Sequence, residues 1–168
     1  LYITEELSHF LNLKLHNTPI NMAEHNIYAL IKETVEKVKS KNENFNIQIK
    51  TEEKEARVNC DRKELSRCIE NILKNAITYS QNSTEIIVEI IKKDDKLIVK
   101  IIDKGIGIKN DIADKIFEPF FSYTPPELYQ QETKRKPGMG LPIAKEIMKN
   151  HNGDIEFESE VNKGTTFY

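Results

Sequence analysis

The sequence predicts a two-layer sandwich of the α/β (α+β) class, in which helices cover one face of a mixed, mostly antiparallel sheet. Three observations support this fold class. Several segments carry apolar residues at helical spacing, and other segments are rich in β-branched residues. Turn-forming residues separate these segments. The length of 168 residues suits one domain with a short appended element.

The first half of the chain is expected to hold three helices and two strands. A first helix has its apolar positions at Ile3, Leu7, Phe10 and Leu11. It ends near His16, because Pro19 disfavours a helical conformation at the residue before it. A second helix has the apolar stripe Ile27, Leu30, Ile31, Val35 and Val38. Strands are predicted at residues 45–49 and 57–59.

A third helix is predicted from residue 61 onward. Asp61 is its cap, and Glu64 is placed as in a capping box. Its buried face is expected to consist of Leu65, Cys68, Ile69, Ile72, Leu73 and Ala76. Two strands should follow at residues 85–91 and 97–102, joined by a hairpin turn at Asp94-Asp95.

The last third of the chain combines loops, a helix and two strands. Asn110 begins a short helix, and residues 122–137 form a long loop, because they contain three prolines and many polar residues. A final helix covers about residues 140–150 and tolerates a proline in its first turn. Closing strands are predicted at residues 155–159 and 165–168.

Composition argues against a nucleic-acid binder. The formal net charge is -2, and the basic run at residues 134–136 is short, so a solvated loop is its simpler interpretation. No segment approaches the roughly 18 apolar residues of a membrane span, and we expect a cytoplasmic domain whose parent is soluble or membrane-anchored. Cys60 and Cys68 lack metal-ligand spacing. The chain begins without methionine and ends inside a predicted strand, so we expect a fragment of a longer protein.

Polar residues recur on one face of the third predicted helix. Asn71, Asn75 and Thr78 are spaced so that they lie on the same side. A solvated polar face is one interpretation. The other is a metal site, because a carboxamide oxygen suits Mg²⁺, which keeps several waters and takes further ligands from phosphates.

Two glycine-containing segments suggest a nucleotide. Asp103 ends an apolar strand and precedes two glycines, which let a ligand approach the backbone closely. Such an aspartate caps a turn, or its carboxylate accepts a hydrogen bond from the exocyclic amine of adenine. Gly138 and Gly140 precede a helix, and the free N–H groups at a helix start favour an anion such as phosphate.

The order of the motifs is more specific than any one of them. The chain carries, in sequence, Asn71-Ile72-Leu73-Lys74-Asn75, Asp103-Lys104-Gly105-Ile106-Gly107, Phe117-Glu118-Pro119-Phe120-Phe121, Gly138-Met139-Gly140-Leu141 and Gly164-Thr165-Thr166-Phe167. From about residue 21 to residue 168, this pattern resembles the ATP-binding catalytic domain of sensor histidine kinases. The resemblance implies the Bergerat fold of the GHKL superfamily, with ATP and Mg²⁺ as ligands.

The resemblance implies a role for each matching residue. Asn75 would be the magnesium ligand, Asn71 a phosphate or water contact, and Asp103 the residue that selects adenine. The other implied nucleotide contacts are Tyr79, Gly105, Gly107, Ile108, Ile116 and Phe121 around the base, Lys134 or Arg135 at the γ-phosphate from a lid at residues 122–137, Gly138, Gly140 and Leu141 at the phosphates, and Thr165 or Thr166 behind the adenine.

Two positions depart from the common family pattern. Many relatives have lysine or arginine where this chain has Thr78, which removes one candidate phosphate contact. Pro142 stands where most relatives have a small residue. Together with the phenylalanine-rich motif, it resembles the subgroup of kinases similar to the nitrogen-regulation sensor.

The resemblance also implies what the chain lacks. His9, His16, His25 and His151 do not match the phosphoacceptor pattern of the family, so all four are expected to be non-acceptors. Residues 1–19 would be the end of a dimerisation helix plus a linker, and residues 20–168 the catalytic domain. We therefore expect a monomeric fragment of a homodimer. Its partners would be its own phosphoacceptor domain and the receiver domain of a response regulator.

Three functions remain open from the sequence. The first is the catalytic part of a protein-histidine kinase. The second is a self-contained ATPase of the same superfamily, which needs a general-base glutamate on the third helix, and Glu70 is available there. The third is a nucleotide-dependent interaction module that transfers no phosphoryl group.

The first helix likewise has two interpretations, since its apolar stripe could pack against this domain or continue a dimerisation helix.

Overall fold

A computed structural model describes residues 2–17, 19–80, 83–123 and 137–168 of the chain. Its centre is a five-stranded sheet of β2 (Asn46–Thr51), β4 (Glu85–Lys93), β5 (Lys96–Asp103), β7 (Gly164–Phe167) and β6 (Phe157–Glu160), in that spatial order. β2 runs parallel to β4, and every other neighbouring pair is antiparallel. The predicted mixed, mostly antiparallel sheet is therefore confirmed.

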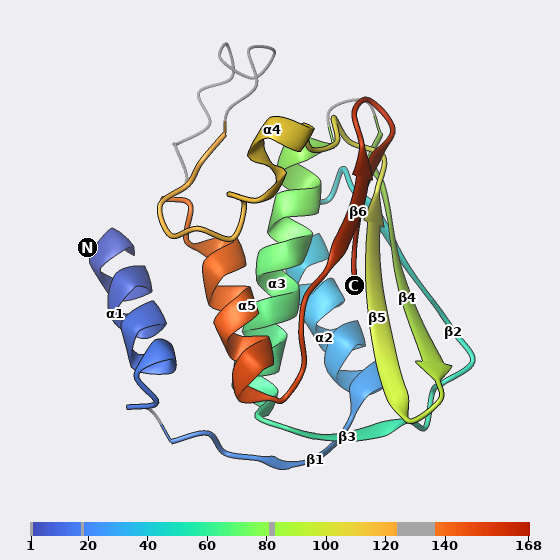
Figure 1. The fold of residues 1–168 in the computed structure, drawn as a ribbon. Coiled ribbons are helices and arrows are strands. Elements are labelled where there is room, and N and C mark those ends of the chain that lie inside the picture. Colours follow the sequence, from blue (N-terminus) through green and yellow to red (C-terminus); the bar gives the residue numbers. More distant parts are fainter. Residues whose placement is uncertain (1, 18, 81–82, 124–136) are drawn as a thin grey trace.

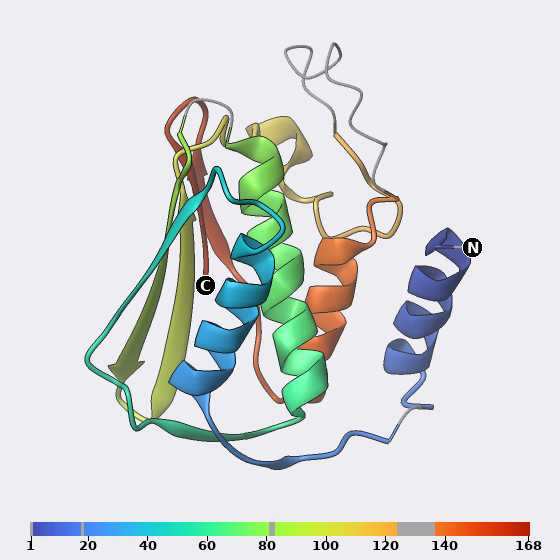
Figure 2. The ribbon, with the colours of Figure 1, turned by 180° about the vertical axis from the view of Figure 1, so that it is seen from behind.

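Helices cover one face of this sheet (Figures 1 and 2). These are α2 (Ile27–Lys39), α3 (Arg62–Tyr79) and α5 (Gly140–Asn150), with the short α4 (Asn110–Ala113) near the end of β5. The core forms where the apolar stripes of the helices meet the inward-facing residues of the strands. Fully buried examples are Leu30, Ile31, Leu73, Ile86, Ile90, Ile101, Ile143 and Ile147. The two-layer sandwich is therefore confirmed.

The structure corrects the expectation that all strands join one sheet. β3 (Arg57–Cys60) pairs antiparallel with β1 (Ala23–Asn26) in a separate two-stranded sheet. β1 has no counterpart in the sequence prediction. Its sequence, Ala23-Glu24-His25-Asn26, has neither alternating polarity nor β-branched residues. Only the long-range pairing with β3 makes this segment a strand.

Asp61 caps α3 as predicted, but the capping box is wrong. The Asp61 side chain accepts hydrogen bonds from the backbone N–H groups of Lys63 (3.0 Å) and Glu64 (3.1 Å). The Glu64 carboxylate does not reach back to the cap. It lies 3.0 Å from Nε2 of His9, a distance typical of an ion pair although the angles do not suit a hydrogen bond. The arrival of the first helix therefore redirects this carboxylate.

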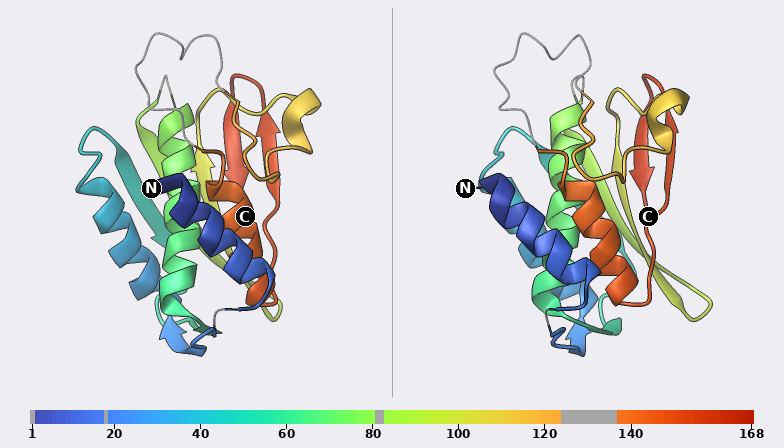
Figure 3. Two further views of the ribbon diagram at one scale, coloured as in Figure 1. Left: turned by 90° about the vertical axis from the view of Figure 1, so that its left-hand side faces the viewer. Right: turned by 60° about the vertical axis from the view of Figure 1, so that its left-hand side comes forward.

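The first helix, α1 (Tyr2–Lys14), packs on the outer side of α5 (Figures 1 and 3). Phe10 and Leu13 are buried in this contact, and Glu6 forms an ion pair with Arg67 of α3 at 2.7 Å. Packing against this domain is therefore confirmed. Exposed apolar side chains remain on the helix at Ile3 and Leu11, so its continuation into a dimerisation segment stays a prediction. Among the described helices, none is long and apolar enough to cross a bilayer.

Candidate functional site

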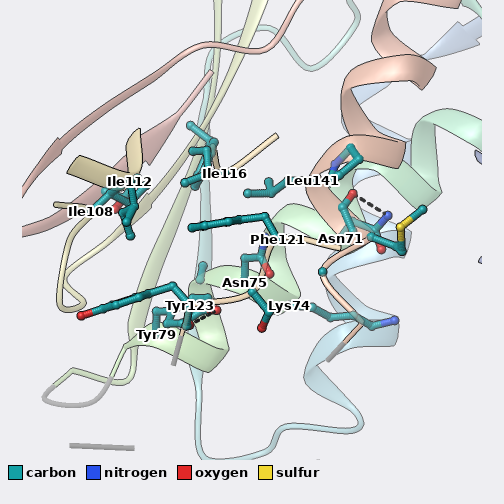
Figure 4. A pocket seen from close by; sticks show the side chains of 18 of the residues that line it. Asn71, Lys74, Asn75, Tyr79, Ile108, Ile112, Ile116, Phe121, Tyr123 and Leu141 are labelled. Carbon is teal, nitrogen blue, oxygen red and sulfur yellow. Dashed lines mark hydrogen bonds between the residues drawn. The ribbon is translucent and has the colours of Figure 1, made fainter. Parts of the chain in front are cut away.

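A cavity of about 330 Å³ opens between α3, the ends of β5 and β7, the segment around α4, and the start of α5. Figure 4 shows Ile108 and Ile112 at one end of it and Asn71 at the other. The predicted site residues that line it are Asn71, Asn75, Tyr79, Asp103, Gly107, Ile108, Ile116, Phe121, Gly138, Gly140, Leu141 and Thr165. Residues from all five motifs, which are far apart in the sequence, therefore meet around one space.

Asp103 is the buried polar group of the cavity. It ends β5, and only 6% of it is exposed. Its Oδ1 atom accepts hydrogen bonds from the backbone N–H of Gly105 (2.8 Å) and of Thr165 (3.3 Å). Burial raises the pKa of this carboxyl group, and the two hydrogen bonds oppose that effect only in part. The group is thus a fixed hydrogen-bond acceptor in a poorly solvated place.

The glycines after Asp103 are required by close backbone contacts. A Cβ atom at Gly105 would collide with the Tyr79 carbonyl at the end of α3. Gly107 has φ of 70°, in the left-handed region, and a Cβ there would collide with the Glu160 carbonyl. Gly105 does not itself line the cavity, but it allows the loop to lie against α3. The N–H of Ile106 then donates to the Tyr79 carbonyl at 3.1 Å.

α3 supplies the amide groups of the site. Nδ2 of Asn71 donates to the Gly140 carbonyl at 3.2 Å, which ties α3 to the start of α5. Asn75 lines the cavity one turn further on. Thr78 is not in the lining, and its hydroxyl donates to the Lys74 carbonyl within the helix at 2.6 Å. The departure at Thr78 therefore leaves no side chain there that extends toward a phosphate.

The metal-ligating groups among the described residues of the site suit a metal ion that enters together with a bound ligand. No group of three or more histidine, cysteine, aspartate or glutamate side chains converges among the described residues. The Asn75 amide, which lines the cavity together with Gly140 of α5, offers a single oxygen atom instead. Such a site fits Mg²⁺, which takes most of its ligands from phosphates and water.

The start of α5 provides a place for an anion. Gly138 has φ of 66° and lies against the Phe121 carbonyl, where a Cβ would collide. Met139, at the cap position, forms no side-chain cap hydrogen bond. Backbone N–H groups in the first turn of a helix lack intrahelical partners and carry the positive end of the helix dipole. The Gly138-to-Leu141 motif therefore favours negative charge at this end of the cavity.

Aromatic and aliphatic side chains form the opposite part of the lining. The Tyr79 hydroxyl donates to the Tyr123 carbonyl at 3.1 Å, and burial raises the pKa of Tyr79. Phe121 lies between Leu141 and the two tyrosines (Figure 4). The cavity is thus apolar at its isoleucine end and polar at its α3–α5 end, a combination suited to a flat base joined to a charged group.

Some predicted residues are not in the lining, and others were missed. Thr166 faces away, because side chains alternate along β7 and its cross-strand neighbours are Ile102 and Glu158. Lys134 and Arg135, with most of the predicted lid, lie outside the described residues. The lining residues that the sequence analysis missed are Glu6, Lys74, Ala76, Ile106, Ile112, Ser122, Tyr123, Pro137, Met139, Pro142 and Phe167. Some of them carried a signal in the sequence. Lys74, Ile106, Met139 and Phe167 stand inside the quoted motifs, and Ser122, Tyr123 and Pro137 fall within the predicted lid. Ile112 is four residues from Ile116, as on one face of a helix.

Comparison with known protein families matches residues 60–168 to the family described as "Histidine kinase-, DNA gyrase B-, and HSP90-like ATPase". "Sensor-like histidine kinase SenX3" of Mycolicibacterium smegmatis is 32% identical over 140 residues, which cover 83% of this chain and 36% of the relative. "Histidine kinase P4" of Formosa agariphila is 30% identical over 179 residues, which cover 99% of this chain and 13% of that relative. The chain therefore spans about a third or less of the length of these relatives.

Solved structures show the same fold. The catalytic domain of histidine kinase ThkA, in a nucleotide-free form, has a TM-score of 0.74 and 26% identity, and the match covers 88% of this chain and 94% of that chain. Full-length ShkA in complex with AMPPNP has a TM-score of 0.83 over 99% of this chain and 34% of its own. At 18% identity, the second likeness concerns the fold alone.

Proposed function

This chain belongs to the family of histidine kinase-, DNA gyrase B- and HSP90-like ATPases, and from that premise we propose that it is the ATP-binding catalytic part of a two-component sensor histidine kinase. In this proposal it transfers the γ-phosphoryl group of ATP to a histidine on a dimerisation domain, from which a response regulator aspartate receives it. One observation carries the proposal. A single cavity joins the buried acceptor Asp103 to the uncapped start of α5.

At the base end, Asp103 would accept a hydrogen bond from the exocyclic amine of adenine. The carboxylate is already oriented by two backbone N–H groups, so little reorganisation is needed when the base binds. Ile108, Ile116 and Phe121 would enclose the faces of the ring. Thr165 adds a second polar group beside Asp103.

At the phosphate end, the first turn of α5 would hold the phosphates through backbone N–H groups. Asn75 would contribute the protein ligand of Mg²⁺, and the ion would neutralise charge on the phosphates when it is bound. Asn71 would hold the Gly140 peptide in place through its hydrogen bond. Lys134 or Arg135 remains the proposed contact to the γ-phosphate.

The histidines with described side-chain contacts support an acceptor outside this chain. His9 faces the Glu64 carboxylate. His151 accepts a hydrogen bond from the Asp61 N–H at Nε2 (2.9 Å), and its Nδ1 lies 2.7 Å from the Ile147 carbonyl. A neutral imidazole satisfies both contacts of His151. The acceptor domain, the homodimer of the whole protein, the receiver-domain partner, the cytoplasmic location and the nitrogen-regulation-type subgroup all belong to this proposal.

The alternative of a self-contained ATPase depends on Glu70 as a base. Its carboxylate forms ion pairs with Lys37 (2.8 Å) and Lys74 (2.7 Å), and it does not line the cavity. Burial alone would raise the pKa of Glu70, but the two ammonium groups outweigh it and lower that pKa. A residue with this environment is a weak candidate for activating water, so the structure favours the kinase.

The test measures binding and transfer separately. Calorimetry with ATP and Mg²⁺ should show binding by the wild type, loss of binding by Asp103→Asn, and metal-insensitive binding by Asn75→Ala. The chain should also phosphorylate a separately supplied dimerisation domain. Binding without transfer to any supplied acceptor would favour the interaction module. Steady ATP hydrolysis without an acceptor would favour the ATPase. Absence of ATP binding by the wild type would contradict the proposal.

A further inference from the structure

Ser159 lies behind the cavity and connects two of its walls. It is a half-buried residue of β6 that does not line the cavity, and it stands opposite Thr165 in the β6–β7 pairing. Three polar groups surround its hydroxyl oxygen. These are the backbone N–H of Ile108 at 2.8 Å, the carbonyl of Gly164 at 3.0 Å and the hydroxyl of Thr165 at 2.8 Å.

The number of protons fixes the direction of each hydrogen bond. A serine hydroxyl has one proton to donate and two lone pairs to accept. The Ile108 N–H can only donate, and the Gly164 carbonyl can only accept. Ser159 therefore gives its proton to Gly164 and accepts from Ile108. One lone pair remains, so Thr165 must donate its own hydroxyl proton to Ser159.

This direction determines what Thr165 presents to the cavity. Thr165 is buried and lines the cavity beside Asp103, to which its backbone N–H donates. Since the hydroxyl proton points toward Ser159, only lone pairs of the Thr165 oxygen remain for a ligand. The Asp103 carboxylate also offers only lone pairs. The two neighbouring groups thus form a pair of acceptors.

We propose that Ser159 is a specificity-determining positioning residue that keeps the Thr165 hydroxyl an acceptor and so selects a 6-amino purine over a 6-oxo purine. The inference rests on the proposed function, because it assumes that a purine nucleotide occupies this cavity. A 6-amino group donates hydrogen bonds to such a pair. A 6-oxo group finds no donor there, and a buried acceptor facing another acceptor is costly.

Replacement of Ser159 by alanine tests the proton direction. In Ser159→Ala the Thr165 hydroxyl is free to rotate and to donate into the cavity. ITP, which has a 6-oxo group, should then bind about 3- to 10-fold more tightly than to the wild type. ATP affinity should stay within about twofold, because Thr165 keeps its lone pairs. Ser159→Thr retains the hydroxyl, so this variant should have the same ratio of ATP to ITP affinities as the wild type. Competition calorimetry with both nucleotides measures this ratio.

A matched control separates this effect from a general structural one. Thr51 has a similar hydroxyl that donates to the Ile90 carbonyl (2.8 Å) and accepts from the Glu53 N–H (2.8 Å), and it is not among the residues that line the cavity. Thr51→Val should change stability but leave the ATP to ITP ratio unchanged. If Ser159→Ala does not fold, Ser159→Cys takes its place in the test. Cysteine has a side-chain volume similar to that of serine but is a weak hydrogen-bonding group, so Ser159→Cys should shift the ratio of ATP to ITP affinities in the direction expected for alanine.

The outcomes distinguish the inference from the function on which it rests. If the Ser159 variants weaken ATP and ITP by the same factor, the hydroxyl is only structural and the inference is overturned. If Ser159→Ala shifts the ratio equally in a Thr165→Val background, the effect does not pass through Thr165 and the inference is again overturned. If the wild type binds no purine nucleotide, the proposed function fails first.

Discussion

At the scale of single residues, Asp103 combines a cost for folding with a role in binding. Burial raises the pKa of its carboxyl group despite the hydrogen bonds from Gly105 and Thr165. A carboxyl group with a raised pKa in the folded state stabilises the fold below its unfolded pKa. That contribution is lost as the pH rises through the folded pKa. At neutral pH the charged Asp103 carboxylate therefore opposes folding. Its role, in the proposed function, is to bind the ligand.

Asp103→Asn should consequently make the ligand-free protein more stable while abolishing ATP binding. The asparagine oxygen can still accept from Gly105 and Thr165, and no charge is buried. We expect the free energy of unfolding to rise by about 1 kcal/mol at neutral pH, and the gain should shrink on acidification as the native aspartate becomes protonated. Urea unfolding of the wild type and the variant at neutral and at acidic pH measures this difference in stability. A variant that is less stable at neutral pH would refute the explanation.

Gly138, just before α5, and Gly140, its first residue, should respond differently to alanine. Gly138 has φ of 66° and its Cβ would meet the Phe121 carbonyl, so Gly138→Ala should cost about 1–3 kcal/mol of unfolding free energy. At Gly140 the nearest atom to an added Cβ is Cγ of Asn71, at 3.7 Å. Gly140→Ala should therefore be neutral or slightly stabilising in the free protein. Equal losses in urea unfolding would contradict this distinction.

At the scale of elements, α1 is attached to the domain by a small contact. Phe10 and Leu13 are its buried side chains, and the pairs Glu6–Arg67 and His9–Glu64 connect it to α3. Glu6 also lines the cavity, so the position of this helix reaches the site. The close contact with His9 is the main cause of the lowered pKa of Glu64.

Removal of residues 1–19 tests the proposed domain boundary. The remaining chain should fold and bind ATP, but with an unfolding free energy lower by about 2–5 kcal/mol, because two buried apolar side chains are lost. Thermal unfolding and calorimetry measure both properties. As a matched pair in the intact chain, Leu13→Ala should cost about 2–4 kcal/mol, whereas Leu11→Ala, 43% exposed, should cost little. A truncated chain that does not fold would refute the boundary.

At the scale of the whole molecule, the two cysteines report on opening of the core. Cys60 and Cys68 are each 2% exposed, and burial raises the pKa of Cys68 to about 12 and also raises that of Cys60. Only the thiolate reacts quickly with alkylating or disulfide reagents. Labelling should therefore require unfolding around Cys60 in β3 or around Cys68 in α3.

ATP with Mg²⁺ should slow this labelling in proportion to its affinity. A ligand at about 100 times its Kd stabilises the native state by about 2.7 kcal/mol, which corresponds to roughly 100-fold slower labelling when opening is a pre-equilibrium. Mass spectrometry over time measures the rate. Asp103→Asn serves as the control, since ATP should leave its labelling rate unchanged. Equal protection of the variant would show that ATP acts outside this cavity.

The sequence by itself determined what depends on neighbours along the chain. The apolar stripe of α3, the Asp61 cap and the hairpin at Asp94 follow from local spacing and turn chemistry, and the structure confirms them. The motif order was enough to identify the family. Local patterns succeed here because helix periodicity and caps are set within a few residues.

The tertiary structure alone decided what depends on distant partners. Strand alternation relative to β5 directs Thr165 into the cavity and Thr166 out of it. The approach of His9 takes Glu64 away from the cap of α3, and β3 makes a strand of β1. Ser159 has its three partners only because β6 pairs with β7 and the N–H of Ile108 lies within hydrogen-bond distance of this pair. Most of these contacts join residues far apart in sequence, as Ile108 and Ser159 are, and no local periodicity encodes such pairings.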